Sequence, residues 1–274
     1  MERILVIVNR EETALSALCA AQAIAARLKS SKISVLCPRL PEDPSFMPTE
    51  EIMTDVRRRQ FNRSSAGSVE ALREIFANWK ASLQQQDVVR WIEVIGDASR
   101  SVGAEATQAD LVVHGHLLGQ VSSDVKAGFD AALFDAAAPV IVASAQPPPT
   151  VAARPVIAWE RTQAVGEAIS AALPLLVHAE HVTIISAAEW GGEPEPPPGG
   201  ILNLLEDGNV PYQVEKFQLR GRKIGHAILA EAQRHQADLL IMGAFTHNAF
   251  VERLIGGATR ELLAQAAITL LLHH

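Results

Sequence analysis

The sequence contains very few cysteines. Its only two, Cys19 and Cys37, form neither a CxxC pair nor a zinc-ligand spacing. This scarcity argues against a small disulfide-stapled secreted fold and against a cysteine-based metal centre. We expect both side chains to be small buried hydrophobes in a reducing compartment.

Long apolar runs and an excess of positive charge are also missing. The opening run ILVIVN is too short for the core of a secretory signal, and Ile268–Leu272 has the length of a strand rather than of a membrane span. The formal net charge of -7 gives no general attraction to nucleic acid or to anionic membranes. We therefore expect a cytoplasmic protein with no nucleic-acid partner and no membrane partner.

Four sequence blocks occur twice in the same order, which indicates an internal duplication. Hydrophobic residues make up 48% of the 274 residues, enough to build a sizeable core in each copy. In the third block the first copy is shorter by two residues. The matching blocks are 3–9 with 154–160, 32–37 with 181–186, 104–115 with 230–243, and 138–144 with 267–273.

Each copy alternates short apolar runs with alanine- and leucine-rich helical patterns. This alternation predicts an α/β fold with two doubly wound, parallel-sheet domains. The run Pro147-Pro148-Pro149 reads as a stiff linker, so we predict domains at 1–146 and 152–274. A second proline-rich stretch, 194–200, is expected to be an exposed loop inside the second copy.

A polar region follows the second predicted strand of the first copy. Within it, apolar residues recur at helical spacing and predict a helix over about 67–86. The run Arg57-Arg58-Arg59 reads as a solvated surface rather than a binding patch. The recurring apolar residues are Val69, Leu72, Ile75, Phe76 and Trp79.

Glycines mark the end of the fourth predicted strand of the second copy. Gly243 ends the strand, where a missing Cβ lets a backbone approach a ligand closely. Gly256-Gly257 opens the next predicted helix, whose free N–H groups would attract an anion, with the Thr259 hydroxyl as a further donor or cap. From these residues alone, a phosphate site and a plain flexible helix entry stay equally open.

The order of elements and this turn resemble the universal stress protein family, specifically its tandem bacterial members. In that family a Gly-x2-Gly-x9-Gly-(Ser/Thr) turn wraps the phosphates and ribose of ATP. This chain reads Gly243-x2-Thr246-x9-Gly256-Gly257, so the spacing is kept while a threonine replaces the second glycine. The resemblance also implies that Glu160, after the first strand, takes the place of an acidic residue near the adenine.

The resemblance implies an ATP site, with Mg²⁺, formed by Glu160, Gly243, Thr246, Gly256, Gly257 and Thr259. The adjacent Trp159 is expected to pack under the following helix, with stacking on a purine as the alternative.

The first copy departs further from the family turn. Asn9 stands at the position of Glu160, and no glycine pair follows its fourth strand. Asp124 and Asp130 would repel a phosphate there. We expect this copy to be a structural partner without a nucleotide, and we regard a metal at His114 and His116 as the weaker interpretation because no further ligand completes a site.

Two functions remain open at this stage. One is a stress-response protein that binds an adenine nucleotide in its second copy; the other is an interaction protein that binds none. The sequence contains no P-loop, no GxGxxG turn and no identifiable nucleophile–base pair, so we expect no catalytic residues and at most slow ATP hydrolysis. The resemblance also implies that the two final strands meet in an internal pseudo-dimer, and it leaves protein partners and a further homodimer open.

Overall fold

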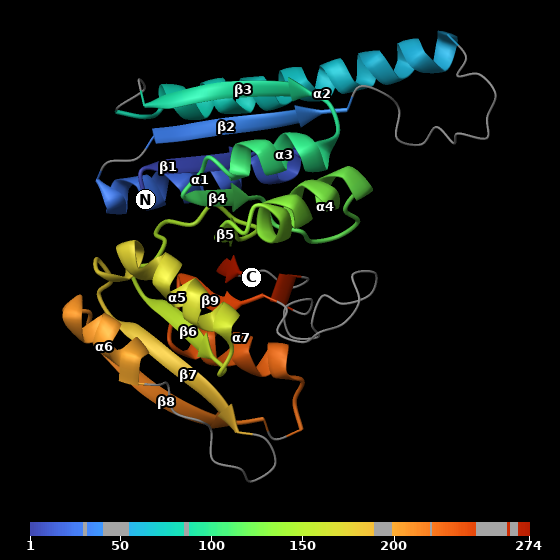
Figure 1. Ribbon diagram of the computed structural model, residues 1–274. Helices are drawn as coiled ribbons and strands as arrows, with labels where there is room; N and C mark the ends of the chain where they lie inside the picture. The colour runs from blue at the N-terminus through green and yellow to red at the C-terminus, as the bar shows by residue number, and fades with distance from the viewer. Residues whose placement is uncertain are drawn as a thin grey trace.

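The computed structural model describes residues 1–29, 32–40, 55–84, 88–188, 199–219, 221–244, 262–263 and 268–274. Strands and helices alternate along these residues (Figure 1). The strands are β1 (Arg3–Ile7), β2 (Lys32–Arg39), β3 (Val89–Ile95), β4 (Leu111–His114), β5 (Val140–Val142), β6 (Pro155–Trp159), β7 (Val182–Ala188), β8 (Tyr212–Gln218), β9 (Leu239–Gly243) and β10 (Thr269–His273). The helices are α1 (Glu11–Leu28), α2 (Asp55–Ala81), α3 (Ala98–Ala106), α4 (Ser123–Asp130), the π-helical turn η1 (Ala131–Asp135), α5 (Gln163–Leu176), α6 (Gly199–Asp207) and α7 (Ile224–Arg234).

The described strands form a single ten-stranded sheet whose order is symmetric about its centre. The order is β3-β2-β1-β4-β5-β10-β9-β6-β7-β8. Each half therefore has its third, second, first, fourth and fifth strands in the same sequence, counted from the outer edge inward. This symmetry confirms the predicted α/β fold and its two doubly wound halves.

The two halves meet through their last strands. β5 and β10 pair antiparallel, with Ile141 opposite Leu271. All other strand pairs of the sheet are parallel, as right-handed crossovers require. The predicted internal pseudo-dimer is confirmed, and its pairing covers two apolar strand edges that would otherwise favour aggregation.

A second contact between the halves involves helices α1 and α5, which pack against each other. Arg27, in the last turn of α1, donates from Nε to the carbonyl oxygen of Val151 at 2.9 Å and from Nη1 to that of His178 at 2.5 Å. A single side chain thus joins helix α1 of the first half to the segment before β6 and to the turn that follows α5 in the second half.

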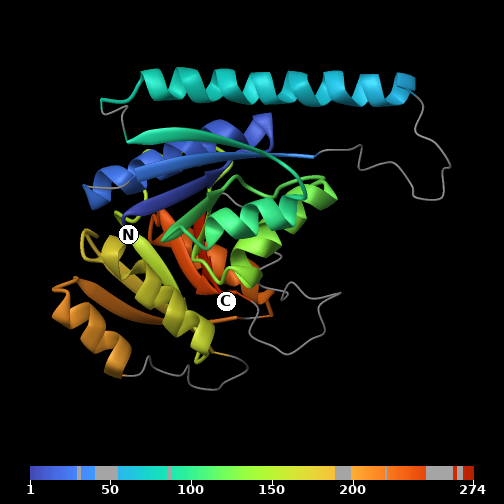
Figure 2. The same ribbon diagram turned by 45° about the horizontal axis from the view of Figure 1, so that its top comes forward.

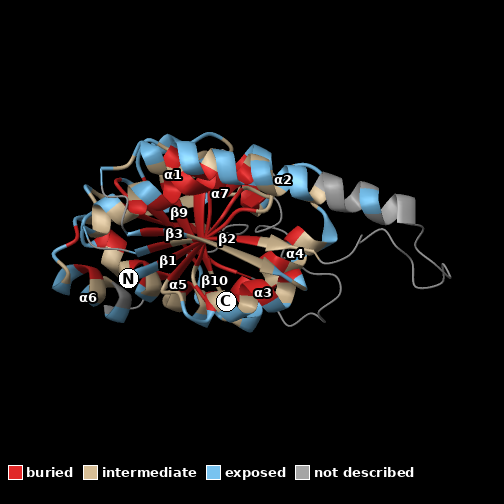
Figure 3. Cartoon of the chain, turned by 90° about the horizontal axis from the view of Figure 1, so that it is seen from above, coloured by how far each residue is buried: buried red, intermediate tan, exposed pale blue. Residues whose placement is uncertain are grey.

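Helices cover both faces of the sheet. Apolar side chains of α1, α2, α5 and α6 pack on one face, and those of α3, α4, η1 and α7 pack on the other. Seen from above, the buried residues gather along the sheet while the outer sides of the helices are exposed (Figure 3). The continuous apolar runs of the sequence are therefore strands buried on both faces.

Helix α2 corrects the predicted helix over 67–86. It begins twelve residues earlier, at Asp55, and ends at Ala81. Figure 2 shows it beside β3 at one end of the molecule, reaching past the sheet. Leu72, Phe76 and Trp79 are buried as expected, whereas the polar first turns give no apolar periodicity from which their helical state could be predicted.

An aspartate fixes the start of the first strand in each half. Asp110 Oδ2 accepts hydrogen bonds from the N–H groups of Glu2 at 2.7 Å and Arg3 at 2.9 Å. Asp238 does the same for Ala153 at 2.8 Å and Arg154 at 2.9 Å. These backbone hydrogen bonds, that of Glu2 most of all, lower the pKa of Asp110. Both aspartates belong to the repeated third block, so the duplication extends to this clamp.

We expect Asp238→Ala to lower the free energy of unfolding by about 2 kcal/mol, because it removes a charged acceptor of two backbone donors and of the Thr150 hydroxyl. Urea denaturation followed by circular dichroism measures the change. Asp207→Ala, at an exposed helix end, is the control and should change stability by less than about 0.5 kcal/mol. Equal effects of the two substitutions would contradict the clamp.

Candidate functional site

The expected site lies where two neighbouring strands of the second half end. Glu160 follows β6, and Gly243 is the last residue of β9; the two strands pair in parallel, with Ile157 opposite Ile241. The chain order reverses between them, because β6 continues to β7 on its other side. In open α/β sheets, ligands bind outside the carboxyl ends of the strands at such a point.

Gly243 packs closely against the first turn of α5. A Cβ atom on Gly243 would lie 2.8 Å from the amide nitrogen of Val165 and 2.9 Å from the carbonyl carbon of Ala164. The same turn is capped by Thr162, whose Oγ1 accepts from the N–H of Val165 at 3.3 Å. We predicted that the missing Cβ of Gly243 lets a ligand approach closely. In the structure, the backbone of the first turn of α5 occupies the space that this Cβ would fill.

Glu160 and Trp159 point to different environments. Glu160 is exposed, whereas Trp159 is buried. Trp159 belongs to the cluster that includes Val165 and Ala168 of α5, which confirms its expected packing under that helix. Its indole nitrogen is buried and has no hydrogen-bond partner among the described residues.

The remaining predicted site residues, Thr246, Gly256, Gly257 and Thr259, lie outside the described residues. Their roles as phosphate ligands stay predictions. Of the predicted set, the structure brings together Glu160 and Gly243, at the ends of adjacent strands.

The corresponding edge of the first half is crossed by an arginine. Arg10, between β1 and α1, donates from Nη1 to the carbonyl oxygen of His116 after β4, at 3.3 Å. Gly115 repeats the close packing of Gly243, since its Cβ would lie 2.5 Å from the Cβ of Thr13 in α1. Asp124 lies in the first turn of α4, where a negative charge opposes an anion. These features disfavour a phosphate at this edge.

His114 is a buried side chain rather than a surface ligand. Its Nδ1 donates to the carbonyl oxygen of Gly115 at 2.7 Å, and its ring meets Phe129 edge-on at 5.6 Å between centroids. Burial lowers the pKa of His114 to about 4. β4 ends at His114, so the strand does not continue to His116 as a shared metal face would require. Within the described residues, no three histidine, cysteine or acidic side chains are grouped so as to hold a metal ion.

Comparisons with known sequences and structures agree with the resemblance to the universal stress protein family. The universal stress protein family matches residues 122–274, more than half of the chain. The chain belongs to this family. A search of curated proteins found no significant match.

Solved structures similar to this universal stress protein cover its whole length. A universal stress protein from Archaeoglobus fulgidus DSM 4304 aligns with a TM-score of 0.69 and 13% identity, over 99% of this chain and 95% of that one. A putative universal stress protein from Pseudomonas aeruginosa UCBPP-PA14 aligns with a TM-score of 0.58 and 15% identity, over 100% and 93%. A functionally unknown protein from Pseudomonas aeruginosa PAO1 gives 0.58 and 14%, over 100% and 92%. At these identities the likeness establishes the fold.

The universal stress protein also has a polar pocket that our sequence analysis did not predict. Its volume is about 260 Å³, and it is lined by Arg154, His181, Thr183, Gln213, Arg234, His235 and Gln236. We call it the basic pocket. The one signal in the sequence was the two-residue difference between the copies, which falls within 233–236.

Among the described helices, none is long and apolar enough to span a membrane.

Proposed function

We propose that this protein is a stress-response protein whose second half binds an adenine nucleotide, ATP with Mg²⁺, at the carboxyl ends of β6 and β9. Nucleotide occupancy then changes its contacts with partner proteins in the cytoplasm. The observation that carries the proposal is the position of Glu160 and Gly243 at the carboxyl ends of the neighbouring strands β6 and β9, where the strand order reverses, in the part of the chain that matches the family.

Among the described residues, those at this edge of the sheet bear on the nucleoside part of the ligand rather than on its phosphates. The Glu160 carboxylate is exposed at the strand end and can accept a hydrogen bond from an adenine amino group or a ribose hydroxyl. The first turn of α5 lies directly behind Gly243, so the positive end of that helix faces the same edge of the sheet. The triphosphate and its Mg²⁺ would be held by the turn at Gly256, Gly257 and Thr259.

We expect the first half to be a structural partner that binds no nucleotide. The hydrogen bond from Arg10 to His116 crosses its strand ends, and the acidic first turn of α4 opposes a phosphate. We therefore propose one nucleotide per chain. The contrast between the halves also provides internal controls.

Titration with ATP, ADP and AMP in the presence of Mg²⁺, followed by thermal unfolding and calorimetry, tests the proposal. A ligand at 100 times its dissociation constant should raise the free energy of unfolding by roughly 2.7 kcal/mol. Gly256→Asp should abolish this gain because it introduces a negative charge where the phosphate is held. Asn9→Asp, at the matching position of the first half, should leave the gain unchanged.

Absence of any shift at millimolar nucleotide would contradict the proposal. The protein would then function as an interaction protein without nucleotide. A shift with two nucleotides bound per chain would contradict the assignment of the first half.

A further inference from the structure

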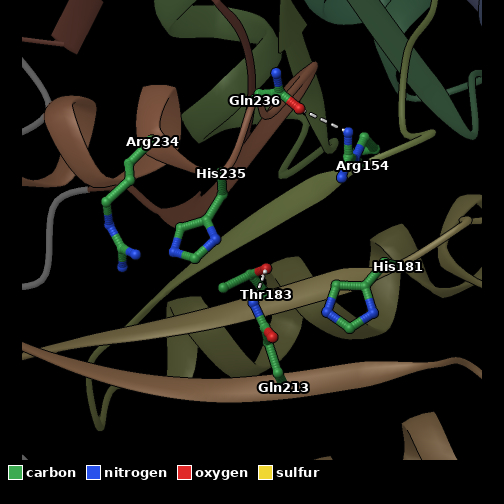
Figure 4. Close-up of a pocket in the computed structure, with 7 residues that line it drawn as sticks. All are labelled: Arg154, His181, Thr183, Gln213, Arg234, His235 and Gln236. Atoms are coloured by element: carbon green, nitrogen blue, oxygen red, sulfur yellow. Dashed lines mark hydrogen bonds between the residues drawn. The ribbon is translucent and has the colours of Figure 1, made fainter.

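The basic pocket lies at the opposite end of the sheet from the strand ends discussed above. Arg154, His181 and Thr183, and Gln213 come from the amino ends of β6, β7 and β8, and Arg234–Gln236 come from the end of α7. Figure 4 shows the guanidinium group of Arg154 and the rings of His181 and His235 around one space, while Arg234 points away from Arg154. A ligand held there would not contact the proposed nucleotide.

Part of the pocket lining, Arg234 to Gln236, lies where the second copy is two residues longer than the first. In the first copy Thr107-Gln108 joins the helix to the repeated Ala-Asp pair, whereas the second copy has Gln233-Arg234-His235-Gln236 at that place. The extra length places Arg234 at the end of α7 and His235 directly after it. The two copies share the cross-strand contact below them, since Gln213 donates to Thr183 Oγ1 at 3.2 Å as Arg90 donates to Ser34 Oγ at 2.8 Å.

The arginine at the start of the first strand is used differently in the two copies. In the first copy, a guanidinium nitrogen of Arg3 lies 4.0 Å from Asp110 Oδ1. In the second copy, Arg154 instead donates from Nη1 to Gln236 Oε1 at 2.8 Å, and no carboxylate of the described residues forms an ion pair with it. The Arg154 guanidinium therefore keeps further N–H donors at the pocket, while the Asp238 carboxylate binds the backbone N–H of Arg154.

The second arginine of the pocket, Arg234, already pairs with two carboxylates. Arg234 pairs with Glu215, and its Nε lies 2.8 Å from Glu231 Oε2. His235 is 11% exposed, and its Nε2 faces the Glu215 carboxylate, 3.2 Å from Oε2. Because Thr183 Oγ1 accepts from Gln213, its own hydrogen is available for donation into the pocket.

We propose that the basic pocket binds a small tetrahedral oxyanion of the phosphate class. The Arg154 guanidinium before β6 and the Thr183 hydroxyl on β7 supply donors, and the rings of His181, directly before β7, and His235, directly after α7, line the same space. Donors arranged around a space suit the oxygens of a tetrahedral group better than the planar fork of a carboxylate. A volume of about 260 Å³ accommodates such a group together with ordered water.

Calorimetric titration of the full chain with inorganic phosphate, at constant ionic strength maintained with chloride, tests this proposal. We expect one phosphate to bind per chain. Arg154→Gln should weaken phosphate binding at least tenfold, and Thr183→Val, which keeps the side-chain volume, should weaken it several-fold. Arg3→Gln, the matching substitution in the first copy, should leave the dissociation constant unchanged.

The controls separate this pocket from the proposed nucleotide site. Gly256→Asp should leave phosphate binding intact, whereas loss of binding in that variant would overturn the proposal by placing the phosphate at the nucleotide turn. Equal weakening by Arg154→Gln and Arg3→Gln would also overturn it, as would tighter binding of acetate than of phosphate. Circular dichroism of each variant without phosphate verifies that it is folded.

Discussion

Leu271→Ala is expected to lower the free energy of unfolding by about 4 kcal/mol, the largest effect of any single truncation that we predict. Leu271 is fully buried in β10, the strand that joins the two halves. It lies opposite Ile141 of β5 and beside Ile241 of β9. Truncation therefore leaves a cavity between the two halves, which the side chains of one half alone cannot fill.

The same substitution reports on the cooperativity of the two halves. Because the sheet is continuous through β5 and β10, we expect one urea transition in which both halves unfold together, shifted to lower urea in the variant. Circular dichroism reports on the whole chain. Tryptophan fluorescence adds a probe in each half, from Trp79 and Trp91 in the first and Trp159 in the second.

Leu15→Ala is the matched control, because it removes the same atoms from a side chain that is 47% exposed. It should change stability by less than about 0.5 kcal/mol. Two separate transitions in Leu271→Ala, or equal effects of the two truncations, would contradict the role that we assign to the central strands.

The alternation of strands and helices in two halves could be predicted because its signals are local and repeated, whereas the junction between the halves followed from the family resemblance. Each buried strand is a continuous apolar run, and the duplication doubles the number of independent observations of the same pattern. The edge strand β8 lies outside the four repeated blocks and alternates between half-buried and exposed residues. The start of α2 was missed because the sequence of its first turns is polar and has no apolar periodicity.

The site was less predictable, because a glycine indicates close approach without identifying what approaches. Gly243 and Gly115 are each required by a helix start, of α5 and α1 respectively, whatever ligand binds nearby. The shared glycine therefore distinguishes the fold from other folds but does not distinguish a nucleotide-binding half from a structural one. That distinction depends on Arg10 and His116 in the first half, whose contact joins two loops 106 residues apart.

The basic pocket illustrates the opposite case, in which residues without a motif converge in space. Arg154, His181 and His235 have no common spacing in the sequence and come from three different elements. The difference of two residues between the copies could have drawn attention to Arg234 and His235, although it gives no direction for their side chains.

His114 should make the protein sensitive to mild acid. Its folded pKa is lowered from 6.5 to about 4 because burial excludes the charged ring, so between these values the unfolded chain binds a proton that the folded chain does not. The free energy of unfolding therefore falls as the pH decreases from 6.5 toward 4. The loss over this window amounts to about 3 kcal/mol, and it is absent above pH 6.5, where both states are neutral.

His114→Met tests this prediction with a residue that the fold already accepts at the matching position, since Met242 precedes Gly243 as His114 precedes Gly115 and is likewise buried. Urea denaturation at pH 7.0 and 4.5 should show most of the 3 kcal/mol loss in the parent chain and a much smaller one in the variant. His178→Gln, at an exposed position, should keep the pH dependence of the parent. An unchanged pH dependence in His114→Met would show that other groups cause the acid sensitivity. The expected result instead assigns it to one ring, placed against Phe129 in the half that carries an arginine across its strand ends.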